Sequence, residues 1–449
     1  MPRKLNDLSQ SSVAFVLFAG LVSFSAYFSM YAFRKPFTAA TYDGFEDWSF
    51  GLDYKVSLVI IQVFGYALSK FLGVKFVSEA PASKRAIMII SLIGSAWLAL
   101  VGFALLPRPY NVLMLFGNGL CLGMIWGLVF SYLEGRRTSE VLGAILCSSF
   151  ILSSGVVKAV GAGLILHLAV PDHWMPAATG ALFFPILAIS VWGLTLLPAP
   201  DGGDQRQRTA RLPMDASARR AFMRRYGSGV VILCTAFVLF TAFRDFRDNF
   251  AAEIWDALGY GDVAAAFALS EAPVAAIVLA VLAMLFFIKN NWLAVGALHL
   301  AIALGALTIG VATYAFEQTW LGPVWWMVAT GAGLYIAYVP FSAMLFDRLM
   351  AAAQFSGTAV FLIYVADASG YLGSVSLLVL KELFAPELPW LRFFVMGAYA
   401  TSIVGVVLTV LSLHYFWRRQ TQAAPGAGAE MTHAGSGSVF LPSAGPATS

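Results

Sequence analysis

The sequence predicts an all-α polytopic membrane protein whose twelve transmembrane helices form two pseudo-symmetric six-helix bundles. The chain of 449 residues is 59% hydrophobic and 12% charged, whereas soluble domains average about 25% charged residues. Apolar runs of about 18 or more residues, enough to cross a hydrocarbon core of about 30 Å, recur along nearly the whole length. Matching motifs also recur in the two halves, so the architecture is predicted to be duplicated.

The membrane spans are the apolar runs that lie between polar, Gly-rich or Pro-rich interruptions. We predict them at residues 12–38, 56–79, 86–106, 111–133, 141–168, 177–197, 227–255, 263–288, 292–315, 321–346, 356–381 and 391–416. The first run is too long for a signal peptide, lacks a small-residue cleavage site and ends in Arg34 and Lys35. It is therefore predicted to be retained as the first helix.

Two polar segments set the predicted domain boundaries. The interruption between the sixth and seventh spans is rich in Gly, Asp and Arg, and the end of the chain is rich in Gly, Ala, Ser and Pro. The terminal segment has too little apolar surface to pack. We predict an N-terminal bundle over 1–198, a cytoplasmic loop over 199–226, a C-terminal bundle over 227–419 and a disordered cytoplasmic tail over 420–449.

The internal repeat rests on short motifs in matching order. Ala-Phe-Arg occurs at 32–34 and 242–244, an offset of 210, and Ser-Gly occurs at 154–155 and 369–370, an offset of 215. Such near-constant spacing indicates duplication of a six-helix unit, as in transporters built from parallel repeats. It places one arginine in the first helix of each half.

Charge asymmetry between the loops predicts the orientation. Seventeen Lys and Arg residues fall on the side of the N-terminus and four on the opposite side. The positive-inside rule therefore places both termini in the cytoplasm, with the protein in the cell inner membrane. The net charge of +4 follows from this topology, so no nucleic-acid partner is implied, and we expect a monomer whose partners are the bilayer and a small substrate.

Enzymatic and metal-dependent classes find little support. The three cysteines and five histidines are scattered without ligand spacing, so no metal or other cofactor is expected. No span or loop offers a nucleophile with a base at helical spacing or a Gly-rich phosphate cradle. A membrane enzyme is therefore the least favoured class.

Charged residues inside the predicted spans are the strongest functional signal. An ionisable group near the bilayer centre costs at least about 2.5–3.5 kcal/mol on insertion scales, so each should face a partner or a water-filled cavity. Lys75 is set aside because it can reach the head groups from a helix end. The remaining candidates are the basic residues Arg34, Lys35, Lys70, Lys158, Arg244 and Arg247 and the acidic residues Asp245, Asp248, Glu271 and Asp367.

Polar and aromatic neighbours at helical spacing indicate a shared cavity. In the first span Tyr27, Tyr31 and Arg34 share one face, and Tyr364 and Asp367 do so in the eleventh. We predict substrate contacts from Arg34, Arg244, Lys35, Tyr27, Tyr31, Lys70, Lys158 and Tyr364, and coupling by ion pairs of Glu271, Asp248, Arg247, Asp245 and Asp367.

The two repeat-related arginines point to an anion. A pseudo-two-fold axis would set Arg34 and Arg244 on opposite walls of one site, and each guanidinium is a planar fork that matches phosphate or carboxylate oxygens. Six basic against four acidic candidates leave two positive charges in excess. The alternative is that some of these charges are structural ion pairs: Arg244 with Asp248 one turn away, and Glu271 with Lys35 or Arg247.

The chain resembles the major facilitator superfamily, and within it the organophosphate:phosphate antiporters that carry glycerol phosphate and hexose phosphates. The similar motifs are Tyr-Ala-Phe-Arg-Lys at 31–35, Ser-Lys-Phe at 69–71, Gly-Met-x-Trp at 123–126 and two glycine motifs at 357–358 and 370–373. By this resemblance Arg34 and Arg244 correspond to the family's phosphate-binding arginines, Lys35 to its first-helix lysine and Glu271 to an eighth-helix acid.

The chain departs from that family at two positions of the site. The fifth-helix histidine is missing, Ser153 and Ser154 stand there, and Lys158 follows about a turn later. The acidic residue expected five positions after Arg244 is Asn249. The substrate therefore stays open between a phosphate ester, a carboxylate and a sulfonate.

Two functions are compatible with this pattern. The first is a secondary active transporter of a small organic anion that works by alternating access, either in exchange for phosphate or together with protons. The second is a membrane receptor that senses such an anion without useful transport.

Overall fold

The computed structural model describes residues 13–42, 48, 51–78, 81–134, 136, 138–198, 216–353 and 360–423. These residues form helices joined by short connections, and no β-strand occurs among them. Most of the predicted central loop and almost all of the predicted tail lie outside the described residues, as does the start of the first predicted span.

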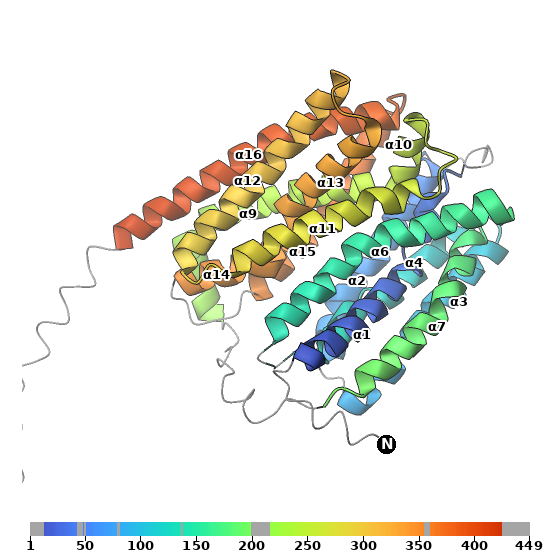
Figure 1. The fold of residues 1–449 in the computed structure, drawn as a ribbon, viewed down its shortest axis with the longest axis horizontal. Helices are drawn as coiled ribbons and strands as arrows, with labels where there is room; N and C mark the ends of the chain where they lie inside the picture. Colours follow the sequence, from blue (N-terminus) through green and yellow to red (C-terminus); the bar gives the residue numbers. More distant parts are fainter. Residues whose placement is uncertain are drawn as a thin grey trace, which may run out of the picture.

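The N-terminal half contributes one group of packed helices, drawn in blue and green in Figure 1. Its helices are α1 (Val13–Tyr31), η2 (Pro36–Ala39), α2 (Tyr54–Ser78), η3 (Ala82–Lys84), α3 (Arg85–Leu105), α4 (Tyr110–Leu122), α5 (Ile125–Phe130), α6 (Ser139–Leu168) and α7 (Met175–Thr195). Within it α2 packs on α4, α3 on α4, and α1 on both α6 and α7.

The C-terminal half forms a second group beside the first, drawn in yellow to red in Figure 1. Its helices are α9 (Ala216–Asn249), α10 (Ala251–Ala257), α11 (Ala266–Phe286), α12 (Asn291–Glu317), α13 (Pro323–Pro340), the π-helix η4 (Phe341–Leu345), α14 (Phe346–Ala352), α15 (Val360–Phe384) and α16 (Trp390–Ala423). Here α12 packs on α13 and α16, and α9 on α15 and α16.

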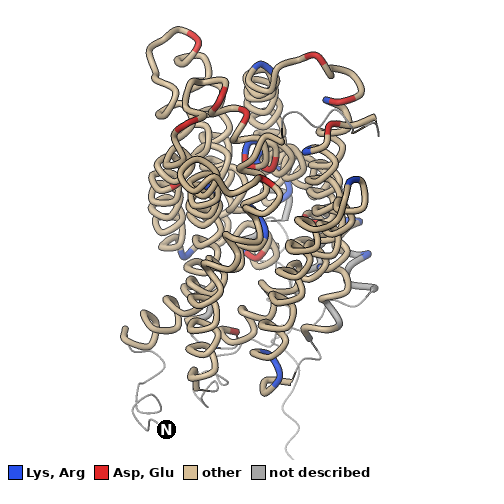
Figure 2. The backbone as a smooth tube through the Cα atoms, turned by 90° about the vertical axis from the view of Figure 1, so that its right-hand side faces the viewer, with Lys and Arg blue, Asp and Glu red and all other residues tan. Residues whose placement is uncertain are grey.

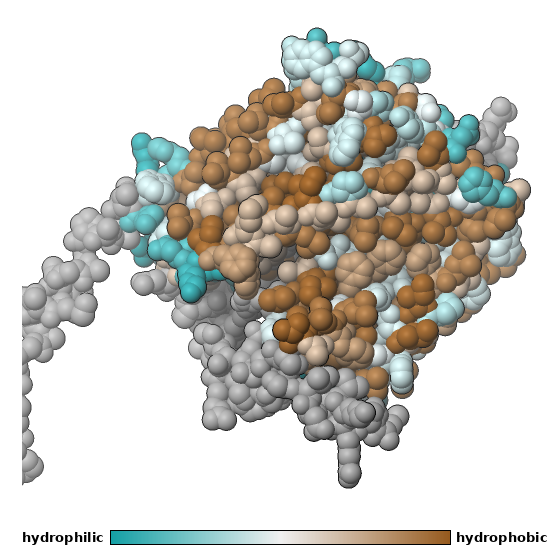
Figure 3. Space-filling model, in the orientation of Figure 1, coloured by the Kyte–Doolittle hydropathy of each residue, from teal (hydrophilic) through white to brown (hydrophobic). Residues whose placement is uncertain are grey.

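Eleven segments of the described chain are long and apolar enough to cross a membrane. The predicted span that is not among these eleven is the eleventh, 356–381, which corresponds to α15, a helix of 25 residues that carries Asp367, Lys381 and Glu382. Leucine, isoleucine, valine and phenylalanine side chains cover much of the outer surface, and Figure 3 shows this apolar surface as brown over the sides of the bundle. The chain is therefore a multi-pass membrane protein.

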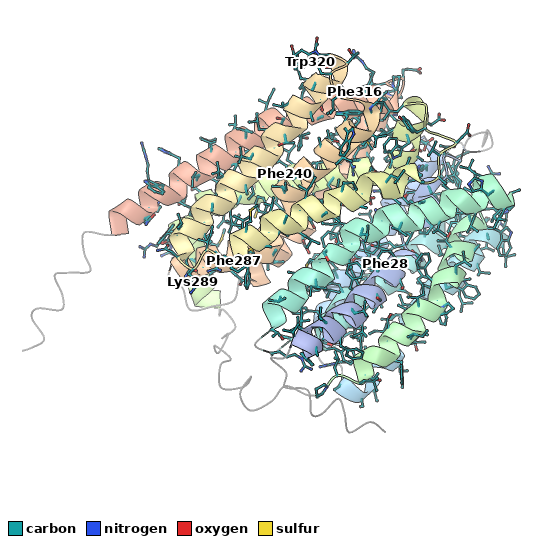
Figure 4. The ribbon with its side chains drawn as sticks, in the orientation of Figure 1. Phe28, Phe240, Phe287, Lys289, Phe316 and Trp320 are labelled. Atoms are coloured by element: carbon teal, nitrogen blue, oxygen red, sulfur yellow. The ribbon has the colours of Figure 1, made fainter. Side chains whose placement is uncertain are left out.

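Polar residues gather at the ends of the helices. Figure 2 shows many of the acidic residues in the connections at one end of the molecule, and Figure 4 labels Lys289 and Trp320 at opposite ends of α12. Trp320 is 75% exposed, as expected for an aromatic side chain at a membrane interface. In Figure 1, α1 begins and α16 ends on the same side of the molecule.

The boundaries differ from the prediction where polar sequence remains helical. The seventh span was expected from residue 227, but α9 already begins at Ala216 and ends at Asn249, before the short helix α10. Exposed arginines are good helix formers, so the first turns of α9 continue the helix beyond the apolar run. The eleventh span was expected from residue 356, but residues 354–359 lie outside the described part.

Candidate functional site

The break at the end of α1 positions the first candidate arginine. Pro36 lacks an amide hydrogen and clashes with a preceding helical turn, so α1 stops at Tyr31 and residues 32–35 form a turn before η2. The predicted continuous helix 12–38 is therefore wrong in its last turn. Arg34 and Lys35 lie in this turn, and their side chains contact different neighbours.

The carbonyl groups freed by this break are satisfied by other helices. Gln62 Nε2 donates to the carbonyl of Arg34 at 2.9 Å, and Asn118 Nδ2 donates to the carbonyl of Phe33 at 2.9 Å. Gln62 also donates to Asn118 Oδ1 at 2.8 Å. A broken helix is tolerated in a bilayer when neighbours take up the exposed backbone groups, so the turn is held in place.

The Arg34 guanidinium lies against aromatic rings. Its carbon is 3.8 Å from the ring centroid of Tyr66 and 5.7 Å from that of Tyr31. Tyr27 packs edge-on to Tyr31 at 5.6 Å. The Arg34 Nε is buried without a hydrogen-bond partner, and among the described residues no carboxylate pairs with this side chain. Arg34 therefore retains donors that could receive an anion.

Asp248 on α9 forms ion pairs with two lysines of the N-terminal half. Its carboxylate lies 2.5 Å from Lys35 Nζ and 2.6 Å from Lys158 Nζ, and the lysine side chains are 7% and 2% exposed. Ser154, one turn before Lys158 on α6, donates to the same carboxylate at 2.5 Å. Lys35 also donates to Asn249 Oδ1 at 2.8 Å. One carboxylate against two ammonium groups leaves this cluster with a formal charge of +1.

Arg244, the second candidate arginine, is already paired. Its Nη2 lies 2.5 Å from Asp245 Oδ1, and its guanidinium carbon lies 4.2 Å from the ring centroid of Tyr338. Asp245 also accepts a hydrogen bond from Ser374 at 2.7 Å. The predicted alternative of an Arg244 pair with Asp248 is wrong, because Asp248 is occupied by the two lysines. Arg34 and Arg244 both lie close enough to Tyr31 for their charges to interact with its hydroxyl group.

Arg247 connects three helices within the C-terminal half. It pairs with Glu271 at 2.6 Å and donates to the carbonyl of Met327 at 2.8 Å, and both side chains are buried. Of the predicted alternatives for Glu271, the pair with Arg247 is therefore present. Burial and two partners indicate that Arg247 holds α9, α11 and α13 together.

Lys70 and Asp367 join α2 to α15. Their charged groups lie 2.8 Å apart, with side chains 28% and 21% exposed. The rings of Tyr66 and Tyr371 meet edge-on at 5.9 Å beside them, and Lys70 Nζ is 5.1 Å from the Tyr371 ring centroid. The pair is more accessible than the Asp248 cluster. The side chain of Tyr364, another predicted contact, lies outside the described part of the chain.

A further ion pair, between Lys55 and Glu253, is not among the predicted candidates. Lys55, expected outside the membrane spans, lies in the first turn of α2 with 1% of its side chain exposed. It contacts Glu253 on α10 at 2.6 Å and the carbonyl of Thr38 at 3.0 Å. The sequence feature that could have predicted this pair is the carboxylate of Glu253, which falls inside the predicted seventh span in the apolar context Ala-Ala-Glu-Ile-Trp.

The ion pairs that join the two halves share one polarity. Among the described residues, each places a lysine on the N-terminal half and a carboxylate on the C-terminal half: Lys35 and Lys158 with Asp248, Lys55 with Glu253, and Lys70 with Asp367. The N-terminal wall is thus cationic, and the opposing wall supplies acceptors. Between α2, α9 and α15 the packing leaves no room for a water molecule, at a place lined by Asp245, Asn249 and Ser374 among others.

The arrangement of helices is that of solved membrane transporters. The peptide transporter POT in complex with sulfate superposes with a TM-score of 0.62 at 14% sequence identity, covering 91% of this chain and 97% of that chain. The nucleoside transporter NupG gives 0.58 at 15% identity over 88% and 98% of the two chains, and a D-xylose-proton symporter gives 0.58 at 13% over 89% and 96%. The chain therefore has the fold of the major facilitator type.

The chain belongs to a sequence family described as a family of unknown function, DUF5690, which it matches over residues 36–419. No curated protein matches it in sequence. The similar structures are transporters and not enzymes, and at these identities they show the fold alone.

Proposed function

We propose that this protein is a secondary active transporter of a small organic anion, working by alternating access between its two bundles. The observation that carries the proposal is the Arg34 guanidinium, which lies between the bundles with no ion-pair partner among the described residues. A charged group in a bilayer interior is costly unless it is paired, so an unpaired arginine there is a binding-site signal. Its planar fork fits the oxygens of a phosphate, carboxylate or sulfonate.

The interior charges support an anion over a neutral or cationic substrate. The six predicted basic residues face four predicted acids, and the additional pair of Lys55 with Glu253 is neutral. The excess of two positive charges is divided between Arg34 and the Asp248 cluster, where one carboxylate faces two lysines. Both sites with excess charge adjoin the turn at residues 32–35.

The ion pairs between the halves provide a route for coupling. An anion that binds Arg34 also lies near Lys35, the next residue in the same turn, and competes with Asp248 for it. Weakening a pair that joins the halves would favour their separation on one side. Ligand-dependent exchange of partners can thus shift the balance between two conformations, provided the anion interacts differently with each.

The preferred substrate is a phosphate ester exchanged for inorganic phosphate, because Arg34, Arg244 and Lys35 are residues by which the chain resembles the organophosphate antiporters. The proposal includes a monomer in the cell inner membrane with both termini in the cytoplasm. Carboxylates and sulfonates stay among the substrates to be tested, because Asn249 stands where that family has an acid and Ser153 and Ser154 stand where it has a histidine.

Counterflow in proteoliposomes tests this function. Vesicles loaded with labelled phosphate are offered sugar phosphates, glycerol phosphate, phosphonates, sulfonates and dicarboxylates outside, with protein-free vesicles and a cationic amino acid as controls. We expect at least one anion to drive efflux of the label. If no anion drives efflux of the label and no proton-driven uptake occurs, transport is refuted. Saturable binding of an anion under those conditions would favour the receptor.

A further inference from the structure

A second basic site lies far from the central ion pairs, on the outer face of the C-terminal bundle. A groove of about 440 Å³ is lined by Ile232 of α9 and by Leu411, His414, Tyr415, Arg418 and Arg419 of α16. Its polar lining is basic or aromatic, with no acidic residue among these side chains. Figure 1 shows this end of α16 at the outer edge of the molecule.

The floor of the groove is built by close packing of α16 on α9. The Tyr415 hydroxyl donates to the carbonyl of Arg225 at 3.1 Å. The Tyr415 ring lies over Gly229, where an added Cβ would be 2.5 Å from a ring carbon, so only glycine allows this approach. Arg419 then lies 5.6 Å from the Tyr415 ring centroid, which holds the guanidinium at the groove.

The groove changes from apolar to basic along α16. Toward the middle of α16 it continues into exposed apolar side chains, with Leu411 49% exposed, Val410 53% and Val407 50%, and Val231 of α9 is 59% exposed. Toward the end of the helix it meets Arg418 and Arg419, both exposed. Figure 3 shows hydrophilic side chains at this end of the molecule beside the brown apolar surface.

We infer that this groove binds the head group of an anionic phospholipid. The phosphate would lie at Arg419 and Arg418, with His414 and the Tyr415 ring beside it, and one acyl chain would run along Leu411 and Val231. A basic pocket at the end of membrane helices attracts anionic lipid, and the apolar continuation is what distinguishes a lipid from a free anion. The groove lies apart from Arg34, so the inference does not depend on the proposed transport.

Native mass spectrometry of the purified full chain tests the inference. Retained lipid is counted after titration with phosphatidylglycerol or phosphatidylcholine of the same acyl chains. We expect preferential binding of phosphatidylglycerol, reduced about thirtyfold in the R418Q/R419Q double variant, the effect of two surface arginines on attraction to anionic lipid. The single variant Arg419→Gln is measured beside the double variant, and its matched control is Arg392→Gln, which changes an arginine 67% exposed near the opposite end of the same helix and should keep full binding.

Three outcomes would overturn the inference. Equal retention of the two lipids would exclude recognition of the anionic head group. Unchanged phosphatidylglycerol binding by a folded double variant, verified by its thermal unfolding, would exclude these arginines. Displacement of the lipid by water-soluble glycerol phosphate at similar concentration would indicate a site for free anions, because the apolar wall would then contribute nothing.

Discussion

Replacing Asp248 by Asn tests the cluster that joins the two bundles. Asp248 pairs with Lys35 at 2.5 Å and with Lys158 at 2.6 Å, and its own side chain is 12% exposed. Asn keeps the shape but removes the charge, which leaves two buried ammonium groups without a counter-ion. Removing one partner of a buried ion pair costs about 3–5 kcal/mol, so we expect Asp248→Asn to lose at least that much stability.

Thermal unfolding of the purified protein in detergent measures this loss. For a chain of this length roughly 1–2 °C per kcal/mol is expected, so the midpoint should fall by about 5 °C. Adding Lys158→Met in the same background removes one uncompensated charge and should recover part of the loss. Asp256→Asn, at an exposed position of α10, is the matched control and should unfold like the wild type.

The reasoning fails if Asp248→Asn unfolds at the wild-type temperature. It fails equally if adding Lys158→Met lowers the midpoint further, because the lysine would then stabilise the fold through contacts other than the ion pair.

Three further predictions concern the contacts between the bundles. Lys55→Met removes the buried pair with Glu253, so an impermeant thiol reagent added outside should label a cysteine at Ser154 several-fold faster in a background without native cysteines; an unchanged rate would refute a gating role. Lys70→Asp and Asp367→Lys should each abolish exchange while the double swap restores part of it, and a swap as inactive as the single variants would contradict a role for this pair. Gly155→Ala should lower the unfolding midpoint by a few degrees, because its Cβ would lie 2.6 Å from the Phe267 carbonyl oxygen and overpacking costs about 1–3 kcal/mol. Gly94→Ala, with nothing within 4 Å, should be neutral, and equal effects of the two changes would contradict the packing argument.

The membrane fold could be predicted from the sequence because hydropathy acts along the chain. Each apolar run must satisfy its own backbone within the bilayer, so a run of sufficient length becomes a helix regardless of its neighbours. Helix ends were harder to predict. The turn after Tyr31 depends on hydrogen bonds that Gln62 and Asn118 donate to the carbonyls of Arg34 and Phe33, and no local pattern in residues 31–36 contains that information.

The sequence indicated most of the charged residues that the structure brings together, but of their ion pairs it suggested only Arg247 with Glu271. A charge inside an apolar run is visible without a structure, which is why Arg34, Asp248 and Lys158 could be selected. Their partners depend on how helices distant in sequence approach each other: Lys158 and Asp248 are 90 residues apart. Helical spacing favoured Arg244 with Asp248, yet the approach of α6 and of the turn after α1 gave this carboxylate to two lysines.

Lys55 shows where the hydropathy argument is weakest. A lysine beside a loop at the end of an apolar run is usually solvated, and the sequence contains nothing that separates this case from a buried one. Burial arises because α10 packs on η2, and Glu253 of α10 and the Thr38 carbonyl of η2 both contact the Lys55 ammonium group.

The central claim is that the Arg34 guanidinium, which pairs with no carboxylate among the described residues, recognises an organic anion. Counterflow with Arg34 variants tests it most directly. Wild type, Arg34→Gln and Arg34→Lys are compared in the same vesicles, with thermal unfolding as the check on folding. We predict that the wild type exchanges at least one anion, that Arg34→Gln loses exchange, and that Arg34→Lys recovers little of it because an ammonium lacks the planar fork. Wild-type exchange by a folded Arg34→Gln variant would contradict the claim.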